Sequence, residues 1–108
     1  MITETNKSPL VETISLPKNY DSISDLFNDA RPLIFAKIII VFNELLSNDE
    51  VSSGISVDSN VNGQKCHMFF GFDKNQPEIL IKVILPYYKE MEEYEMCAEI
   101  LKLYNKLK

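Results

Sequence analysis

Residues 55–70, ISVDSNVNGQKCHMFF, decide the fold of this chain. The pair Asn62-Gly63 at their centre is strongly preferred in a two-residue type I′ hairpin turn, because both central residues of that turn need a positive φ. A turn at this point sets the register of the two strands, and one face of the hairpin becomes apolar. The predicted cross-strand pairs are Val61–Gln64, Ser59–Cys66, Asp58–His67, Val57–Met68, Ser56–Phe69, Ile55–Phe70 and Gly54–Gly71.

Two further elements are predicted after the hairpin. Residues 73–77 have the composition of a turn, and residues 78–85 alternate between apolar and other positions, which is typical of a third antiparallel strand. Pro86 then begins a final helix, whose broad apolar stripe is expected to pack on the sheet.

Two helices are predicted before the hairpin. Ser22 precedes Asp25 by three residues, the spacing of a capping box, and opens a short helix that the segment 29–32 interrupts. Pro32 starts a second helix that continues to about Ser47. Residues 33–46 of this helix are the most hydrophobic part of the chain and also suit a buried strand, but their length favours a helix.

These elements predict an α+β fold with two N-terminal helices, a three-stranded antiparallel β-meander and a C-terminal helix packed on the sheet. Residues 21–108 are expected to form a single domain. Residues 1–20 are interpreted as a flexible tail or a short edge strand, with an extra N-terminal strand at residues 10–16 as the alternative.

Composition excludes several classes of protein. The 108 residues are 45% apolar, too many for a disordered chain, and no apolar run approaches the roughly 18 residues of a membrane span. The first residues lack the pattern of a secretory signal, so a cytoplasmic location is expected. The net charge of −5 disfavours direct binding to nucleic acid or to an anionic membrane, because both are negatively charged.

Few residues of the sequence are candidates for catalysis or for binding a cofactor or metal. Asp58 opposite His67 resembles an acid/base pair, yet a surface ion pair needs only the same two residues. Cys66 adjoins His67 but points to the other face of its strand, so the two cannot share a proton directly. Cys66 and Cys97 are expected to be reduced core thiols, and the three glycines are too scattered for a phosphate loop. We therefore expect no enzyme, no cofactor and no metal site.

The start of the final helix is the predicted partner-binding site. Tyrosine provides contact area with a polar tip, and clustered carboxylates can steer a basic partner into place. The same residues could equally form a solvated helix face. The predicted site comprises Tyr88, Glu90, Glu92, Glu93, Tyr94 and Glu95.

Two non-catalytic functions are considered as alternatives to an enzyme. The first is a non-catalytic protein-binding module that inhibits or neutralises a partner with a basic surface, like an immunity protein specific for a toxin or a phage-encoded antagonist. The second is a dimeric adaptor or secretion chaperone that holds a client segment in an apolar groove or at a sheet edge. Apolar surface on the second helix that the domain does not cover would serve a homodimer or a client.

Overall fold

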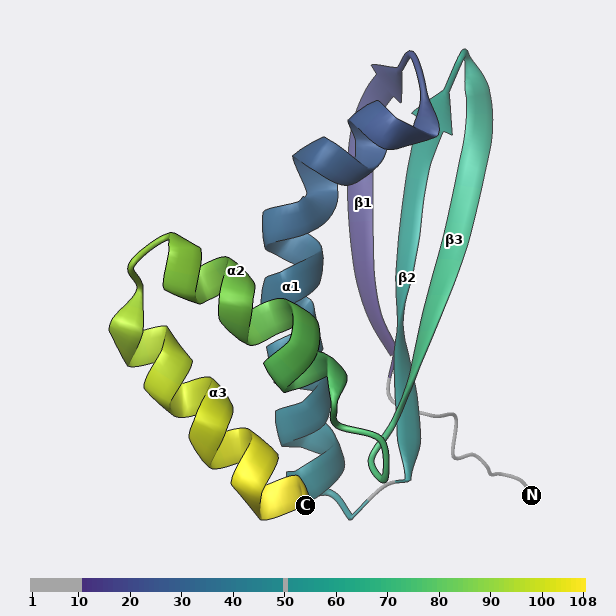
Figure 1. Cartoon of the computed structure of the whole chain (residues 1–108). Coiled ribbons are helices and arrows are strands. Elements are labelled where there is room, and N and C mark those ends of the chain that lie inside the picture. Colours follow the sequence, from purple (N-terminus) through teal and green to yellow (C-terminus); the bar gives the residue numbers. More distant parts are fainter. Residues whose placement is uncertain (1–10, 50) are drawn as a thin grey trace, which may run out of the picture.

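The computed structural model describes residues 11–49 and 51–108, and within them the chain has an α+β fold with a three-stranded mixed sheet (Figure 1). The elements, in chain order, are β1 (Val11–Tyr20), α1 (Ile23–Ser47), β2 (Ser52–Val61), β3 (Gln64–Asp73), the π-helical segment η1 (Leu80–Ile84), α2 (Leu85–Glu90) and α3 (Tyr94–Leu107).

The hairpin is built as predicted. Every predicted cross-strand pair between β2 and β3 is present, from Val61–Gln64 to Gly54–Gly71. Asn62 and Gly63 have φ values of 54° and 77°, the positive angles that a type I′ turn requires. The odd-numbered residues of β2 from Ser53 to Ser59 are buried, so this face of the sheet is directed to the core.

The predicted antiparallel meander is wrong, because the third strand of the sheet comes from the N-terminal side of the hairpin. β1 pairs with β2 in parallel, and α1 connects the two strands. β1 includes most of the alternative strand predicted at residues 10–16, of which Leu10 lies outside the described residues. Parallel pairing across a helical crossover leaves no local turn signal in the sequence.

The two predicted N-terminal helices are one continuous helix. Ser22 caps α1 as expected, accepting the Asp25 amide at 3.1 Å, but the helix runs through Pro32. A proline inside a helix costs about 3 kcal/mol. Burial on both sides of Pro32 offsets that cost, because one buried stripe continues along the whole helix. The stripe comprises Leu26, Ala30, Ile34, Ile38, Val41, Phe42 and Leu45.

The predicted strand at residues 78–85 is also wrong. The residues buried there are Leu80 and Ile84, and the next buried residue is Tyr88, so the spacing is that of a helix rather than of a strand. The segment is wound as a π-helix immediately before Pro86, and the Leu85 amide bonds the Leu80 carbonyl. This wider winding relieves the clash between a proline ring and the preceding turn.

The predicted final helix is divided at Met91–Glu93 into α2 and α3, and it does not pack on the sheet. α3 contacts α1, α2 and η1, while β1 and β2 contact the other side of α1. The sheet, α1 and the α2–α3 hairpin therefore form three successive layers (Figure 1). Among the described residues, no helix has the length and apolar character needed to cross a membrane.

A small polar cluster joins α1 to β1. The ammonium of Lys37 lies 3.0 Å from Glu12, and Glu44 lies beside the same carboxylate. Oε1 of Glu44 is buried and has no hydrogen-bond partner among the described residues. Burial raises the pKa of Glu44, and the negative charge of Glu12 raises it further. Lys37 and Glu44 thus face β1 instead of the open solvent.

We predict that Glu44→Gln stabilises the protein at neutral pH. The pKa of Glu44 in the folded state lies above its ordinary value of 4.5, so the ionised carboxylate opposes folding. The free energy of unfolding therefore falls as the pH rises from 4.5 through the folded-state pKa. The glutamine variant should have the higher melting temperature at pH 7, and the difference should close as the pH approaches 4. Thermal unfolding at several pH values measures it, with the exposed Glu78→Gln as control. A less stable glutamine variant at pH 7 would contradict this account.

Candidate functional site

The turn between α2 and α3 gathers four exposed glutamates, which we call the acidic tip. Glu90 ends α2, Glu92 and Glu93 lie in the turn, and Glu95 is in the first turn of α3. The tip lies at the end of the α2–α3 hairpin, on the side of α1 away from the sheet (Figure 1). No ion pair found among the described residues uses any of the four carboxylates.

Apolar groups accompany these carboxylates at the surface. Tyr94 is 64% exposed and Met91 is 50% exposed, both large fractions for such side chains. A shallow hollow of about 600 Å³ lies beside Tyr94, between the turn and the first residues of α3. An exposed aromatic ring surrounded by charged groups is a typical feature of protein interfaces.

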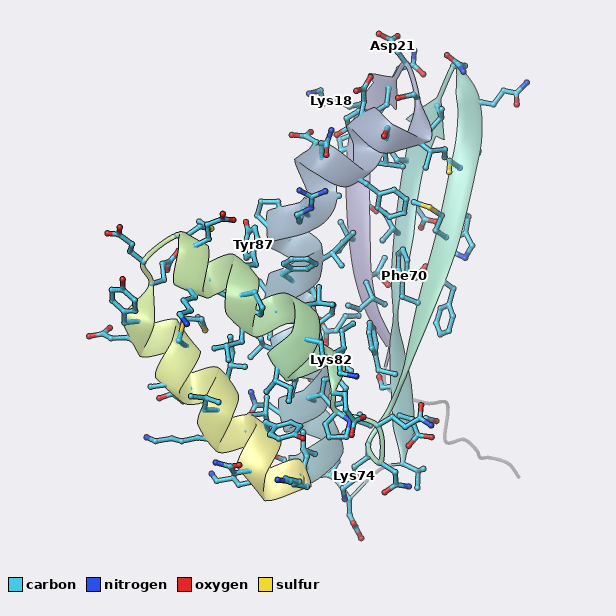
Figure 2. All side chains as sticks on the ribbon, viewed as in Figure 1. Lys18, Asp21, Phe70, Lys74, Lys82 and Tyr87 are labelled. Atoms are coloured by element: carbon cyan, nitrogen blue, oxygen red, sulfur yellow. The ribbon has the colours of Figure 1, made fainter. Side chains whose placement is uncertain are left out.

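Tyr88 has a different place from the other predicted site residues. It is only 7% exposed and packs in the core, with its ring 5.1 Å from that of Tyr87. Burial raises the pKa of its hydroxyl. Tyr87 in turn lies edge-on to Phe35 of α1, at 4.8 Å between ring centroids, and Figure 2 shows it at the junction of α2 and α1. The two tyrosines therefore hold α2 on α1, beneath the tip.

The backbone of the tip is strained at Glu92. The amides of Glu92 and Glu93 bond the carbonyls of Lys89 and Tyr88, both at 3.0 Å, which is the Schellman arrangement that ends a helix. Glu92 occupies the position in this motif that usually holds glycine, and its φ is 61°. The tip therefore combines an unfavourable backbone conformation with crowded like charges.

The predicted pair Asp58–His67 does form, on the open face of the sheet. Nδ1 of His67 contacts Oδ1 of Asp58, and both side chains are at least half exposed. They line a shallow hollow of about 450 Å³ together with Ser15, Pro17 and Lys65.

Ser15 extends this pair into a row of three residues, because β1–β2 pairing sets it opposite Asp58. The order across the strands is Ser15, Asp58, His67, so the carboxylate lies between the hydroxyl and the imidazole. Neighbouring strands are about 4.8 Å apart, which puts Ser15 two strand spacings from His67. A nucleophilic relay needs the hydroxyl against the imidazole, and this row lacks that arrangement. Sequence reasoning missed Ser15 because it missed the parallel pairing.

An apolar groove runs between α1 and β3. Its volume is about 260 Å³, and Phe70 and Phe72 of β3 face Ile34, Phe35 and Ile38 of α1 across it. Figure 2 shows Phe70 directed from β3 toward α1. The groove exists because α1 packs mainly over β1 and β2 and leaves the inner face of β3 only partly buried. Among the described residues that line it, Arg31 is the only charged one.

We predict that Glu92→Gly stabilises the protein by about 1 kcal/mol relative to Glu92→Ala, because a residue with a Cβ pays roughly that cost in the left-handed conformation. Both variants remove the same charge, so the comparison isolates the backbone contribution. Urea denaturation of the two variants measures the difference in unfolding free energy. Equal stability of the glycine and alanine variants would show that the turn is not strained at Glu92.

Comparison with known proteins adds no relative from which a role could be transferred. No protein-family model, curated protein or solved structure matches this chain.

Proposed function

We propose that the chain is a non-catalytic protein-binding module that inhibits or neutralises a partner protein, and that the acidic tip contacts a basic surface on that partner. An immunity protein or a phage-encoded antagonist would act in this way. The observation that supports the proposal is the combination of the exposed Tyr94 with four exposed glutamates on one turn, none of which forms an ion pair within residues 11–49 and 51–108.

Two energetic features of the tip support an interface. Like charges on one turn repel, and the left-handed Glu92 adds backbone strain. Neither feature helps the chain to fold. A basic partner would remove the repulsion and give the carboxylates their missing counter-charges.

The tip is also well shaped for rapid association. Its exposed carboxylates lie at one end of the α2–α3 hairpin, which the contacts of Tyr87 with Phe35 and Tyr88 hold on α1. Electrostatic steering raises association rates by one to three orders of magnitude at low ionic strength. Tyr94 and Met91 would then supply the apolar contacts that hold the complex.

The test is a double charge reversal, Glu93→Lys with Glu95→Lys. The wild-type protein is used to capture its partner from cells of its natural source, and association with that purified partner is followed at increasing salt. We expect the reversal to lower the association rate by about 10- to 100-fold at low salt and to abolish its salt dependence.

A second reversal serves as control. Asp21→Lys with Glu78→Lys changes the net charge equally at exposed positions outside the acidic tip, and it should leave most of the rate intact. If the tip reversal has no larger effect than this control, the acidic tip is not the binding surface.

The adaptor function remains a second candidate because α1 is not fully covered. The groove leaves apolar side chains of α1 and β3 open to a client segment. Leu33 and Ile40, on a different face of the helix, are 47% and 41% exposed. A dimeric adaptor requires a stable assembly, so light scattering that shows a monomer at micromolar concentration would contradict this candidate.

A further inference from the structure

β3 is an edge strand with a long free side. It is ten residues long, and among the described residues only β2 pairs with it. A free edge presents a row of unpaired amides and carbonyls and can template the addition of another strand.

The hydrogen-bond pattern shows which residues of β3 point outward. The Asn62 amide donates to Tyr20 of β1, and the Lys74 amide, just past β3, donates to Val51 beside β2. The amide and carbonyl groups of successive residues point alternately to the two sides of a strand. The backbone groups of the even-numbered residues of β3 therefore point toward β2, and those of the odd-numbered residues point toward the free edge. The outward residues are Lys65, His67, Phe69, Gly71 and Asp73.

This edge lacks the usual protection against another strand. Phe69 is 58% exposed on the open face, and Phe70 and Phe72 are partly buried on the other face. The opposite edge of the sheet differs, because β1 carries Pro17 and Lys18 within an irregularity of its pairing. Proline, lysine and bulges are the devices that protect an edge, and of these β3 has only Lys65, its second residue.

We propose that the occupant of this edge is a second copy of the chain, paired antiparallel along β3 with Phe69 at the twofold axis. In this register each odd-numbered residue of β3 lies opposite an odd-numbered residue of the second copy, so the free backbone amides and carbonyls of the two strands can hydrogen-bond to one another. Lys65 of each copy lies opposite Asp73 of the other, and His67 opposite Gly71. On the inner face Met68 lies opposite Phe70 of the second copy.

Charge complementarity selects this register and this partner. Lys65 and Asp73 stand at equal distances from Phe69, four residues on either side, and both side chains belong to the open face. Lys65 is exposed and takes part in none of the ion pairs of the described residues. Asp73 accepts the Asn75 amide through one carboxylate oxygen. Strand β3 is therefore neutral and self-complementary, although the chain as a whole is acidic.

Strand pairing alone buries less than the roughly 1,200 Å² of a stable interface. The apolar groove beside the edge supplies further area, because Phe70 and Phe72 form its β3 wall. The register sets Met68 and Cys66 of the second copy next to these two rings. The dimer would thus close part of the groove that the monomer leaves open.

The test is a charge exchange across the twofold axis, measured by sedimentation equilibrium on the purified protein alone. Lys65→Glu and Asp73→Lys should each raise the dimer dissociation constant roughly tenfold, because two cross-strand ion pairs become repulsive. The double variant should restore the wild-type value. Within one copy the two residues are about 27 Å apart along the strand, too far for any direct rescue. Lys106→Glu, at an exposed position on α3, is the control and should leave the constant unchanged.

Hydrogen exchange provides the second measurement. The amides of His67, Phe69 and Gly71 should become protected only at concentrations where the dimer forms. A monomer at millimolar concentration, or a dimer that the charge exchange does not restore, would overturn the proposal. Protection of these amides in the monomer would overturn it too, because another segment of the same chain would then cover the edge. Since no other protein is present, these outcomes are independent of the acidic tip and its partner.

Discussion

Every layer of this protein depends on the burial of one helix on two sides. α1 packs against β1 and β2 on one side and against α3 on the other, and η1 packs against α2 and α3. Leu26, Ala30, Val41, Phe42 and Leu45 are completely buried in it. Neither outer layer has a core of its own, so the apolar stripe of α1 stabilises both. This shared burial explains why the helix tolerates Pro32, since ending at the proline would leave half of the stripe unpacked.

The sequence predicted what local chemistry determines. The adjacent residues Asn62 and Gly63 determine the turn of the hairpin and with it the register of its strands. Ser22 likewise marks the start of α1. Long-range choices were not predictable in the same way. The pairing of β1 with β2 depends on a helix that separates them by more than thirty residues, and the alternation at residues 78–85 fits a strand and a helix equally until neighbours bury Leu80 and Ile84.

The same division applies to the candidate sites. The glutamates of the acidic tip are close in sequence, so their proximity needed no fold. The burial of Tyr88 and the left-handed conformation of Glu92 follow from how the final helix breaks, which composition does not reveal. The apolar groove was even less visible, because it arises from the offset of α1 over the sheet and not from any motif.

The Schellman turn at Glu92 has a consequence for how this surface can change over time. Its hydrogen bonds are all made by backbone groups, and the tyrosines that fix it lie below the surface. The exposed side chains of the turn can therefore be exchanged while the scaffold stays constant. Natural variation should accumulate there faster than in the hairpin, because substitutions at these exposed side chains leave the core unchanged.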